Sequence, residues 1–232
     1  MATITKPKRE SKKFTTPVFR ASFPNIAEAR EPDDGGKAKF GVSAIWTPSK
    51  FTDGEKTQYR AILAELDAVS LRDFKKNWKK LPDNIKRGLR DGAAKEQEGY
   101  GEGTRFANLT THNRPGVVTT KRRLNKKTGK QEWVPIPEDK IASEIYPGCY
   151  CRATVNVYSY GLKAGSKGKG VAIGLINIQK VKDGARLDNR VNAEDDFDEE
   201  LDAAWMDEAD GNEDFDDFDG DDADDGDEDE AF

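Results

Sequence analysis

The acidic and basic residues of this chain are strongly segregated along its length. Residues 194–232 contain 23 acidic side chains and no Lys or Arg, so residues 1–193 hold all 38 basic residues and 21 of the 44 acidic ones. The acidic stretch has too few apolar residues to offset its conformational entropy, which costs about 1–2 kcal/mol per ordered residue. We therefore expect a disordered acidic tail at 194–232, a folded domain at 14–193 and a flexible basic arm at 1–13.

The net charge of +17 on residues 1–193 favours a polyanionic partner, such as a nucleic acid or an anionic membrane surface. No apolar run reaches the 18 residues that a membrane span needs, and the N-terminal sequence MATITKPKRESKK lacks the apolar core of a secretory signal. Of the two kinds of partner, a nucleic acid therefore fits the sequence, and we expect no membrane contact.

The two cysteines, Cys149 and Cys151, are two residues apart, which places both thiols on the same face of a strand. The chain contains one histidine, so there are too few soft ligands for a zinc site. Two cysteines in a chain of this length also fit a reducing compartment. We expect buried free thiols, with no metal and no cofactor.

Alternation of apolar and polar residues predicts that the domain is mainly β. The strongest pattern is at 148–161, where one face carries Cys149, Cys151, Ala153, Val155 and Val157. Residues 24–36 are expected to form a loop. Further strands are expected at 18–23, 37–46, 106–111, 117–124, 132–136 and 171–181.

Apolar residues at helical spacing predict an amphipathic helix at about 54–76, and a second, short helix is expected near 83–91. The glycine-rich stretch 92–105 is expected to be a mobile loop. Five or six short strands with a helical element inserted at about 52–91 indicate a small β-barrel or a β-sandwich.

The polar face of the strand at 148–161 is unusual because it carries aromatic rings and an arginine. Aromatic rings stack on nucleobases at about 1–3 kcal/mol per base, whatever the base. Basic loops near this strand complete a groove that suits single-stranded nucleic acid. Proteins that bind duplex DNA usually insert a helix into its major groove. The proposed contacts on the strand are Tyr150, Arg152, Tyr158 and Tyr160, and those on the basic loops are Lys121, Arg122, Arg123, Lys126, Lys127, Lys130, Lys163, Lys167 and Lys169.

Other residues are open to two interpretations. Trp133, Phe106 and the neighbouring Arg105 are candidates to reach the nucleic acid, but Trp133 and Phe106 also fit a core position. Trp78 fits a cap over the core better than a contact. Tyr158 and Tyr160 fit packing under the inserted helices as an alternative to a binding role.

Enzyme signatures are missing from the sequence. It contains no G-x-S-x-G or H-E-x-x-H motif and no Ser–His or Cys–His pairing. The run GEGTRF lacks the G-K-[ST] of a phosphate-binding loop, and the acids of the tail do not match a calcium-binding loop. We therefore expect a binding protein with no catalytic residues.

The stretches EIYPGCYCRATVNVYSYG and KGKGVAIGLINIQKVKDGARL, with an acidic C-terminus that ends in Phe, resemble one family of phage-encoded single-stranded DNA-binding proteins. The likeness covers roughly residues 14–190 in pattern, together with the end of the tail. It implies an OB-fold core, although the inserted helical block at 52–91 departs from a minimal OB-fold. That block fits a brace, a contact in a homodimer or additional DNA surface.

The resemblance also implies sequence-independent binding of single-stranded DNA during phage replication and recombination, in the cytoplasm of the infected bacterium. The tail would compete with DNA and contact replication proteins such as the polymerase and the helicase–primase. A flexible chain of 39 residues reaches roughly 35 Å, compared with a radius of gyration of about 16 Å for the domain. The tail residues expected to matter most are Asp227, Glu228, Asp229, Glu230 and Phe232.

Two alternatives remain open at the level of sequence. One is an RNA-binding protein, which would prefer RNA through contacts with the 2′-hydroxyl. The other is a general nucleoprotein or chaperone-type interaction protein, whose acidic tail handles basic partners. Such a protein would bind duplex and single strand alike, or neither.

Overall fold

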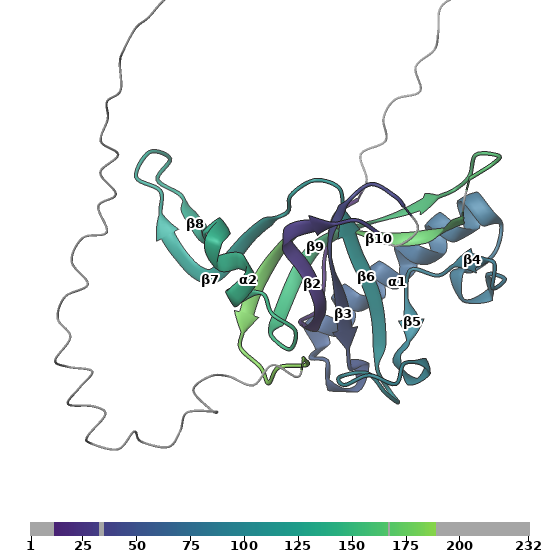
Figure 1. The fold of residues 1–232 in the computed structure, drawn as a ribbon, viewed down its shortest axis with the longest axis horizontal. Coiled ribbons are helices and arrows are strands. Elements are labelled where there is room, and N and C mark those ends of the chain that lie inside the picture. The colour runs from purple at the N-terminus through teal and green to yellow at the C-terminus, as the bar shows by residue number, and fades with distance from the viewer. Residues whose placement is uncertain (1–11, 33–34, 167, 189–232) are drawn as a thin grey trace, which may run out of the picture. The chain divides into compact units, whose positions relative to one another are not determined.

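The computed structural model describes residues 12–32, 35–166 and 168–188 (Figure 1). The predicted acidic tail, nearly all of the predicted basic arm and Lys167 lie outside these residues. The described part of the chain is mainly β, as predicted. Within it, no helix is long and apolar enough to cross a membrane.

Five strands close into a barrel. In order around the ring, β2 pairs with β3, β3 with β6, β6 with β10, β10 with β9, and β9 again with β2. The β6–β10 pair is parallel and the other four are antiparallel. The predicted small β-barrel is thus confirmed. The barrel strands are β2 (Phe19–Arg30), β3 (Lys39–Trp46), β6 (Arg105–Thr111), β9 (Tyr150–Tyr160) and β10 (Lys169–Lys182).

Shorter elements surround the ring. β1 extends the sheet beside β9, β4 pairs with the start of β10, β5 pairs with the start of β6, and β7 pairs with the end of β10. These strands are β1 (Phe14–Thr15), β4 (Ile85–Lys86), β5 (Arg90–Asp91), β7 (Gly116–Leu124) and β8 (Gln131–Pro135). The helices are α1 (Asp53–Phe74) and α2 (Ile141–Glu144), with 3-10 turns η1 (Pro48–Lys50), η2 (Trp78–Lys80), η3 (Gly92–Ala94) and η4 (Glu138–Lys140).

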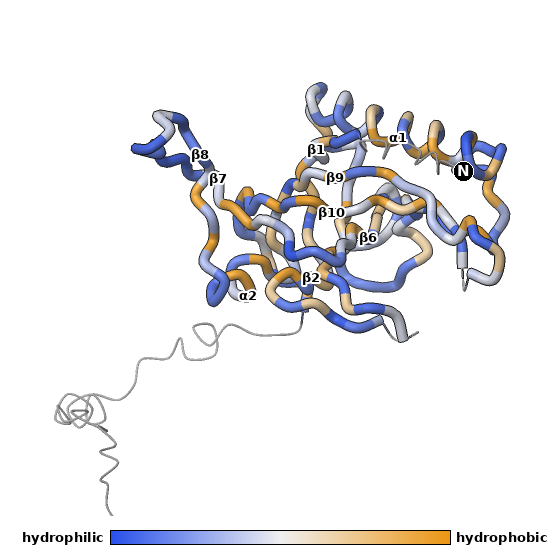
Figure 2. Tube along the Cα trace, turned by 90° about the horizontal axis from the view of Figure 1, so that it is seen from above, coloured by the Kyte–Doolittle hydropathy of each residue, from blue (hydrophilic) through white to orange (hydrophobic). Residues whose placement is uncertain are grey.

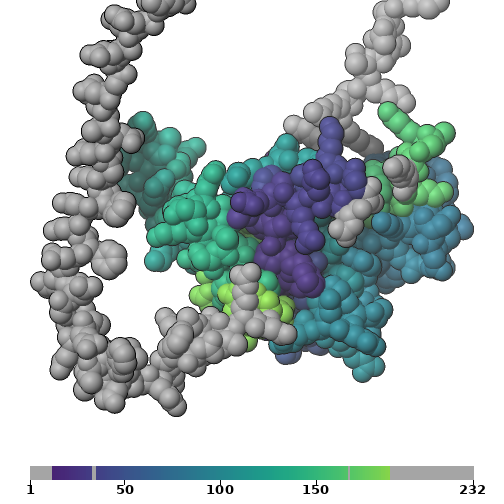
Figure 3. All heavy atoms as spheres, viewed as in Figure 1, coloured from purple at the N-terminus to yellow at the C-terminus, as the bar shows by residue number. Residues whose placement is uncertain are grey.

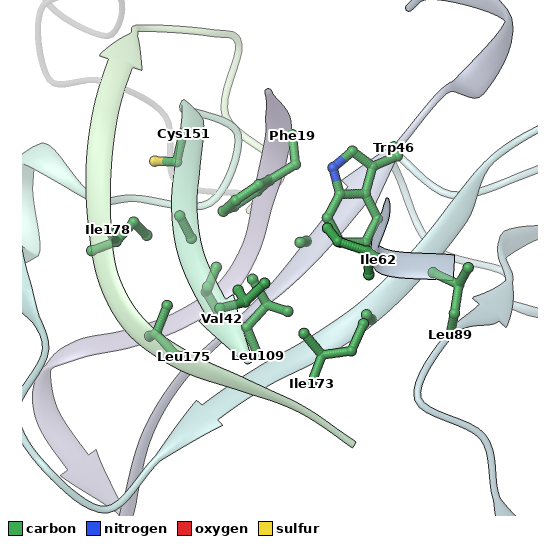
Figure 4. Packing of buried hydrophobic residues seen from close by; sticks show 14 of the residues in the cluster. Phe19, Val42, Trp46, Ile62, Leu89, Leu109, Cys151, Ile173, Leu175 and Ile178 are labelled. Carbon is green, nitrogen blue, oxygen red and sulfur yellow. The ribbon is translucent and has the colours of Figure 1, made fainter. Parts of the chain in front are cut away.

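The interior of the barrel is filled by the apolar faces of its strands together with one face of α1 (Figure 4). Phe19 and Trp46 meet edge to face with ring centroids 5.9 Å apart. Cys149 and Cys151 are buried free thiols with their sulfur atoms 3.6 Å apart, as predicted. Burying one large apolar side chain contributes about 1.5–3 kcal/mol, so this cluster carries most of the stability of the fold.

Helix α1 has clear start and stop signals. The Thr52 side chain accepts a hydrogen bond from the backbone N–H of Glu55, while the Glu55 carboxylate accepts one from the backbone N–H of Thr52. The helix ends at Lys75, which adopts the left-handed conformation with φ 59°. Near this end, the Ser159 hydroxyl of β9 donates a hydrogen bond of 2.5 Å to Asp73, which fixes the helix against the barrel. The predicted helix is confirmed.

Two predictions about secondary structure are wrong. Residues 24–30 were expected to be loop, but β2 continues to Arg30 through irregular pairing with β3. The expected helix at 83–91 is instead the pair of short strands β4 and β5. Ile85 and Leu89 imitate helical spacing because both are buried, yet Gly88 between them lies in a bend packed against Leu66. A glycine interrupts a helix at a cost of about 1 kcal/mol relative to alanine.

The hairpin β7–β8 projects from the barrel (Figure 1). Its outer part is almost uniformly hydrophilic, whereas the segment next to the barrel contains apolar residues (Figure 2). At this inner end, Val117 and Ile136 are buried and join the core. The hairpin is therefore anchored at its base and exposed toward its tip.

Candidate nucleic-acid interface

Strand β9 divides its side chains between the interior and the outer face, as its alternation predicts. Cys151, Ala153, Val155 and Val157 are buried in the core. On the outer face, Tyr158 is 39% exposed, while Tyr150, Arg152 and Tyr160 are half-buried. The tyrosine rings therefore lie at the surface and not in the core.

Strand β10 offers small residues beside the two C-terminal tyrosines. Gly170 is paired with Tyr160, Ala172 with Tyr158 and Gly174 with Asn156. A Cβ atom added at Gly174 would lie 3.0 Å from the ring of Tyr158, and one added at Gly170 would lie 3.0 Å from the hydroxyl of Tyr160. The two tyrosine side chains thus lie against the backbone of Gly170 and Gly174. The small residues of β10 form a shallow surface that is bordered by the tyrosine rings.

The same outer surface continues across the barrel to β6 and β3. Ile173 of β10 is paired with Leu109 of β6, so the preceding residues, Ala172 and Asn108, lie on neighbouring strands. Asn108 is in turn paired with Ser43 of β3. The Ser43 hydroxyl donates a hydrogen bond of 2.9 Å to Oδ1 of Asn108. A row of short side chains therefore crosses the strands from Tyr158 to β3.

A groove of about 860 Å³ lies at this side of the barrel. Its volume falls within the range of about 300–1,000 Å³ that is usual for ligand sites. Basic and aromatic side chains dominate its walls. It is lined by Phe23, Ser43, Trp78, Lys79, Arg87, Leu89, Arg90, Asp91, Ala94, Lys95, Arg105, Phe106 and Asn108.

Arg90 connects the groove to the tyrosines of β9. Its guanidinium lies 4.3 Å from the centroid of Phe106. Partial burial lowers the pKa of Arg90, while the nearby hydroxyls of Tyr100 and Tyr160 act in the opposite direction. A guanidinium remains charged under such conditions, so Arg90 places a cation between the tyrosine face and the groove.

Two residues that the sequence suggested as contacts to nucleic acid, Arg105 and Phe106, line this groove. Neither of them presents a free charge or an exposed ring there. Phe106 is 5% exposed, with Tyr100 packed edge to face at 5.1 Å, so its ring lies under the surface and does not present a stacking face. Arg105 forms a 2.6 Å ion pair with Asp91, which offsets its charge. Phe106 fits its alternative interpretation as a packing residue.

At the other end of β9, Arg152 and Trp133 come together. The ring of Trp133 of β8 lies near two cations, with the guanidinium of Arg122 at 4.1 Å and that of Arg152 at 5.8 Å from its centroid. Nε of Arg152 donates a 2.5 Å hydrogen bond to Gln179, whose amide nitrogen donates to the carbonyl of Thr119. This chain of contacts joins the hairpin to the outer face of β9.

The two predicted basic segments lie on opposite sides of the domain in the view of Figure 3. The hairpin β7–β8 is near Arg152, and the β9–β10 loop follows Tyr160. Tyr160 follows Arg152 by eight residue steps along β9, a span of about 26 Å at about 3.3 Å per residue. The exposed cations are Lys121, Arg122, Arg123, Lys126, Lys127 and Lys130 on the hairpin, with Lys163 on the loop and Lys169 at the start of β10.

Tyr150 differs from the other two tyrosines. Its ring is half-buried beneath Lys182, whose ammonium lies 4.7 Å from the ring centroid. A Cβ atom added at Gly184 would lie 2.7 Å from the same ring, so the segment after β10 packs closely on it. Tyr150 is therefore less accessible than Tyr158.

Sequence reasoning missed Phe23, Arg90 and Lys95. They belong to segments that were expected to be a strand end, a helix and a loop, and nothing in their local pattern joins them. The sequence shows that Arg87, Arg90 and Lys95 are basic, but it does not show that they lie in one groove. Only the fold brings them together there with Phe106. Among the described residues, no cluster of three or more His, Cys, Asp or Glu could hold a metal ion.

A closed five-stranded Greek-key barrel with a basic, aromatic outer face defines an OB-fold of the kind that binds oligonucleotides. The model of one family, described as "Enterobacter phage Enc34, ssDNA-binding protein", matches residues 12–212. The chain belongs to this family.

Individual relatives are more distant. A curated protein named "Putative protein p50", from Acyrthosiphon pisum secondary endosymbiont phage 1, is 27% identical over 168 residues, which cover 71% of this chain and 80% of that protein. The solved single-stranded DNA-binding protein of bacteriophage Enc34 in complex with ssDNA superposes with a TM-score of 0.57 at 18% identity, covering 76% of this chain and 89% of the other. A second solved structure, described as the single-stranded DNA-binding protein from bacteriophage Enc34, gives a TM-score of 0.55 at 17% identity, covering 80% of this chain and 89% of the other. These two similarities show the OB-fold alone.

Proposed function

We propose that this protein binds single-stranded DNA without sequence preference, with bases stacked on Tyr158 and Tyr160. The observation that carries the proposal is the pair of outward rings over the small residues of β10, with cations at both ends of the strand. Every base has a π-face, so stacking tolerates any sequence. Membership of a family described by ssDNA binding supports the same function.

The geometry favours unpaired strands over duplex. In a duplex each base is covered by its neighbours, so its face cannot lie on a tyrosine ring. The rings also lie in a shallow surface of strands, whereas duplex readers usually insert a helix into the major groove. The flanking cations of the hairpin and of the β9–β10 loop would neutralise phosphates and release counterions.

We further propose that the acidic residues 194–232 compete with DNA for this cationic face. Their 23 negative charges complement a domain with a net charge of +17. DNA would displace them, and the released residues, with Phe232 at the end, would contact a replication protein such as the polymerase or the helicase–primase. On this proposal the protein coats and protects single strands during phage replication or recombination in the host cytoplasm.

The central test compares two double variants by fluorescence anisotropy with oligo-dT. Tyr158→Ala with Tyr160→Ala removes both rings, so the affinity should fall by about 1–3 kcal/mol for each base that can no longer stack. Tyr158→Phe with Tyr160→Phe keeps both rings and should bind nearly as well as the wild type. Equal binding by the alanine variant and the wild type would refute this site.

A salt titration separates the stacking from the charge contribution. The logarithm of the binding constant should fall with the logarithm of salt concentration, by about 0.7 per phosphate contact. Charge reversal at the hairpin tip, Lys126→Glu with Lys127→Glu, should make this slope shallower, whereas the alanine variant of the tyrosines should leave it unchanged. Parallel titrations with RNA and duplex DNA test the two alternatives. A preference for RNA, or equal binding of duplex and single-stranded DNA, would contradict the proposal.

A further inference from the structure

Phe23 is held in an unusual backbone conformation at the rim of the groove. Its φ is 46°, a region that a bulky residue rarely adopts. The pairing of β2 with β3 is irregular between Ser22 and Asn25, and the Asn25 side chain fixes the bulge by donating a 2.6 Å hydrogen bond to the carbonyl of Lys39. The bulge turns the ring outward, so that 56% of Phe23 is exposed.

The ring of Phe23 does little for the fold. More than half of the residue faces solvent, and it is not part of the barrel core. Backbone strain of this kind persists only where the surrounding structure imposes it, and it concentrates at binding sites. An exposed ring on a strained bulge, at the edge of a cationic groove, is placed to contact a ligand.

The charges beside this ring are suited to a nucleic acid. The Lys95 ammonium lies 4.6 Å from the ring centroid of Phe23 and 4.1 Å from that of Tyr100. Lys79, Arg87 and Arg90 line the same groove. Among the described residues that line it, Asp91 carries the only negative charge, and that charge is paired with an arginine.

Trp78, which also lines the groove, carries a hydrogen-bond donor that the described part of the chain leaves unsatisfied. The residue is 7% exposed, and its indole N–H is buried with no hydrogen-bond partner in the described part of the chain. An indole N–H can only donate, and a buried donor without a partner is costly. Because this N–H is covered by its neighbours, an acceptor oxygen on a phosphate or a base would satisfy it once the covering side chains shift on binding.

We propose that this groove is a second nucleotide subsite, in which a base stacks on Phe23, Trp78 donates to an acceptor oxygen and Lys95 and Arg90 bind phosphate. The proposal rests on the proposed function, because the occupant is the same DNA strand that lies on Tyr158. From Tyr158 the outer surface crosses β10 and β6 to Ser43 of β3, which lines the groove together with Phe23. The DNA strand would therefore run across the barrel strands.

Three substitutions at Phe23 test the subsite in the full-length protein. Phe23→Leu removes the aromatic face and should weaken binding of a long oligo-dT, about 16 nucleotides, by roughly 5- to 150-fold. Phe23→Trp retains a stacking face and should bind like the wild type. Phe23→Gly also loses the ring, but it should leave the melting temperature unchanged or raised, because glycine adopts a positive φ without strain.

The combination of outcomes distinguishes a binding role from a structural one. Weak binding by Phe23→Gly together with an undiminished melting temperature supports the subsite. The control Leu71→Ala removes another exposed apolar side chain, on α1, and should alter neither quantity. Wild-type affinity in both Phe23→Leu and Phe23→Gly would overturn the proposal.

Trp78→Phe provides a second readout, since it keeps an aromatic ring and removes the N–H. Loss of this hydrogen bond should weaken binding by roughly 2- to 12-fold. An oligomer with one abasic position distinguishes a phosphate acceptor from a base acceptor. If Trp78→Phe weakens binding of abasic DNA as much as it weakens binding of intact DNA, the acceptor is a phosphate. If it weakens binding of abasic DNA less, the acceptor is a base. An unchanged affinity of Trp78→Phe for all oligomers would count against the subsite.

Failure of this subsite differs from failure of the proposed function. If the wild type binds oligo-dT and the alanine variant of Tyr158 and Tyr160 is weakened, while the Phe23 variants bind normally, only the second subsite is wrong. If the wild type does not bind oligo-dT, both proposals are wrong.

Discussion

Gly174 of β10 provides a sensitive test of how the stacking surface is built. Its backbone φ is not in the left-handed region, so alanine is allowed there by backbone conformation. The obstacle is space: an added Cβ would lie 2.3 Å from Oδ1 of Asn156 and 3.0 Å from the ring of Tyr158. Gly174→Ala should therefore push both side chains away from β10.

The expected change in stability is moderate. Overpacking of this kind costs about 1–3 kcal/mol, and replacing glycine by alanine recovers about 0.4–1 kcal/mol through the unfolded state. The net loss of about 0.5–2 kcal/mol corresponds to a fall in melting temperature of about 1–8 °C for a domain of this size. Displacement of Tyr158 should also weaken binding of single-stranded DNA.

Gly170→Ala is the matched comparison. There the added Cβ would lie 2.4 Å from the backbone carbonyl of Lys86, which pairs with β10 and cannot rotate away as a side chain can. Calorimetry should show a larger fall in melting temperature for Gly170→Ala than for Gly174→Ala. If Gly174→Ala melts and binds like the wild type, the floor of small residues does not position the tyrosine.

Three further predictions concern the helix and the acidic tail. A hydrogen bond from Arg72 lowers the pKa of Asp73 in the folded protein. The ionised carboxylate therefore stabilises the fold above the ordinary carboxyl pKa, and this stabilisation is lost as the pH falls through the lowered pKa. Asp73→Asn should lower the melting temperature at pH 7, and the melting temperatures of variant and wild type should converge in acid. Thr52→Ala removes the helix cap and should cost about 1 kcal/mol, about 2–4 °C in melting temperature, whereas Thr57→Ala on the exposed side of the helix should cost less. Deletion of 194–232 should tighten DNA binding, most strongly at low salt, and unchanged affinity at low salt would contradict the proposed competition.

Periodicity in the sequence predicted the regular parts of the fold well. Strand β9 alternates over its whole length, and the residues assigned to its inner face are the ones that are buried, because one face of the strand must pack against the core. Helix α1 was predicted for the same reason, since Ile62, Leu66 and Val69 repeat at helical spacing and face the barrel. In both elements, local pattern and tertiary packing require the same arrangement.

The segment after α1 and the groove could not be predicted in this way. Ile85 and Leu89 have the spacing of a helix, but the segment forms two short strands because β4 pairs with β10 and β5 pairs with β6. The groove combines Phe23, Trp78 and Lys95 from three distant segments, and its shape depends on a bulge that local sequence does not reveal. Only the closed barrel brings these residues together.

Strand β10 closes the ring, since it pairs with β6 on one side and β9 on the other. During synthesis the nascent chain consequently exposes the unpaired edges of β6 and β9 until β10 has been made. The acidic stretch starts at Glu194, 12 residues after Lys182, and residues 194–232 take about 2–8 s to translate at about 5–20 residues per second. The ribosome thus completes all strands of the barrel before it has made the acidic stretch, so folding of the DNA-binding face can begin while its proposed competitor is still being translated.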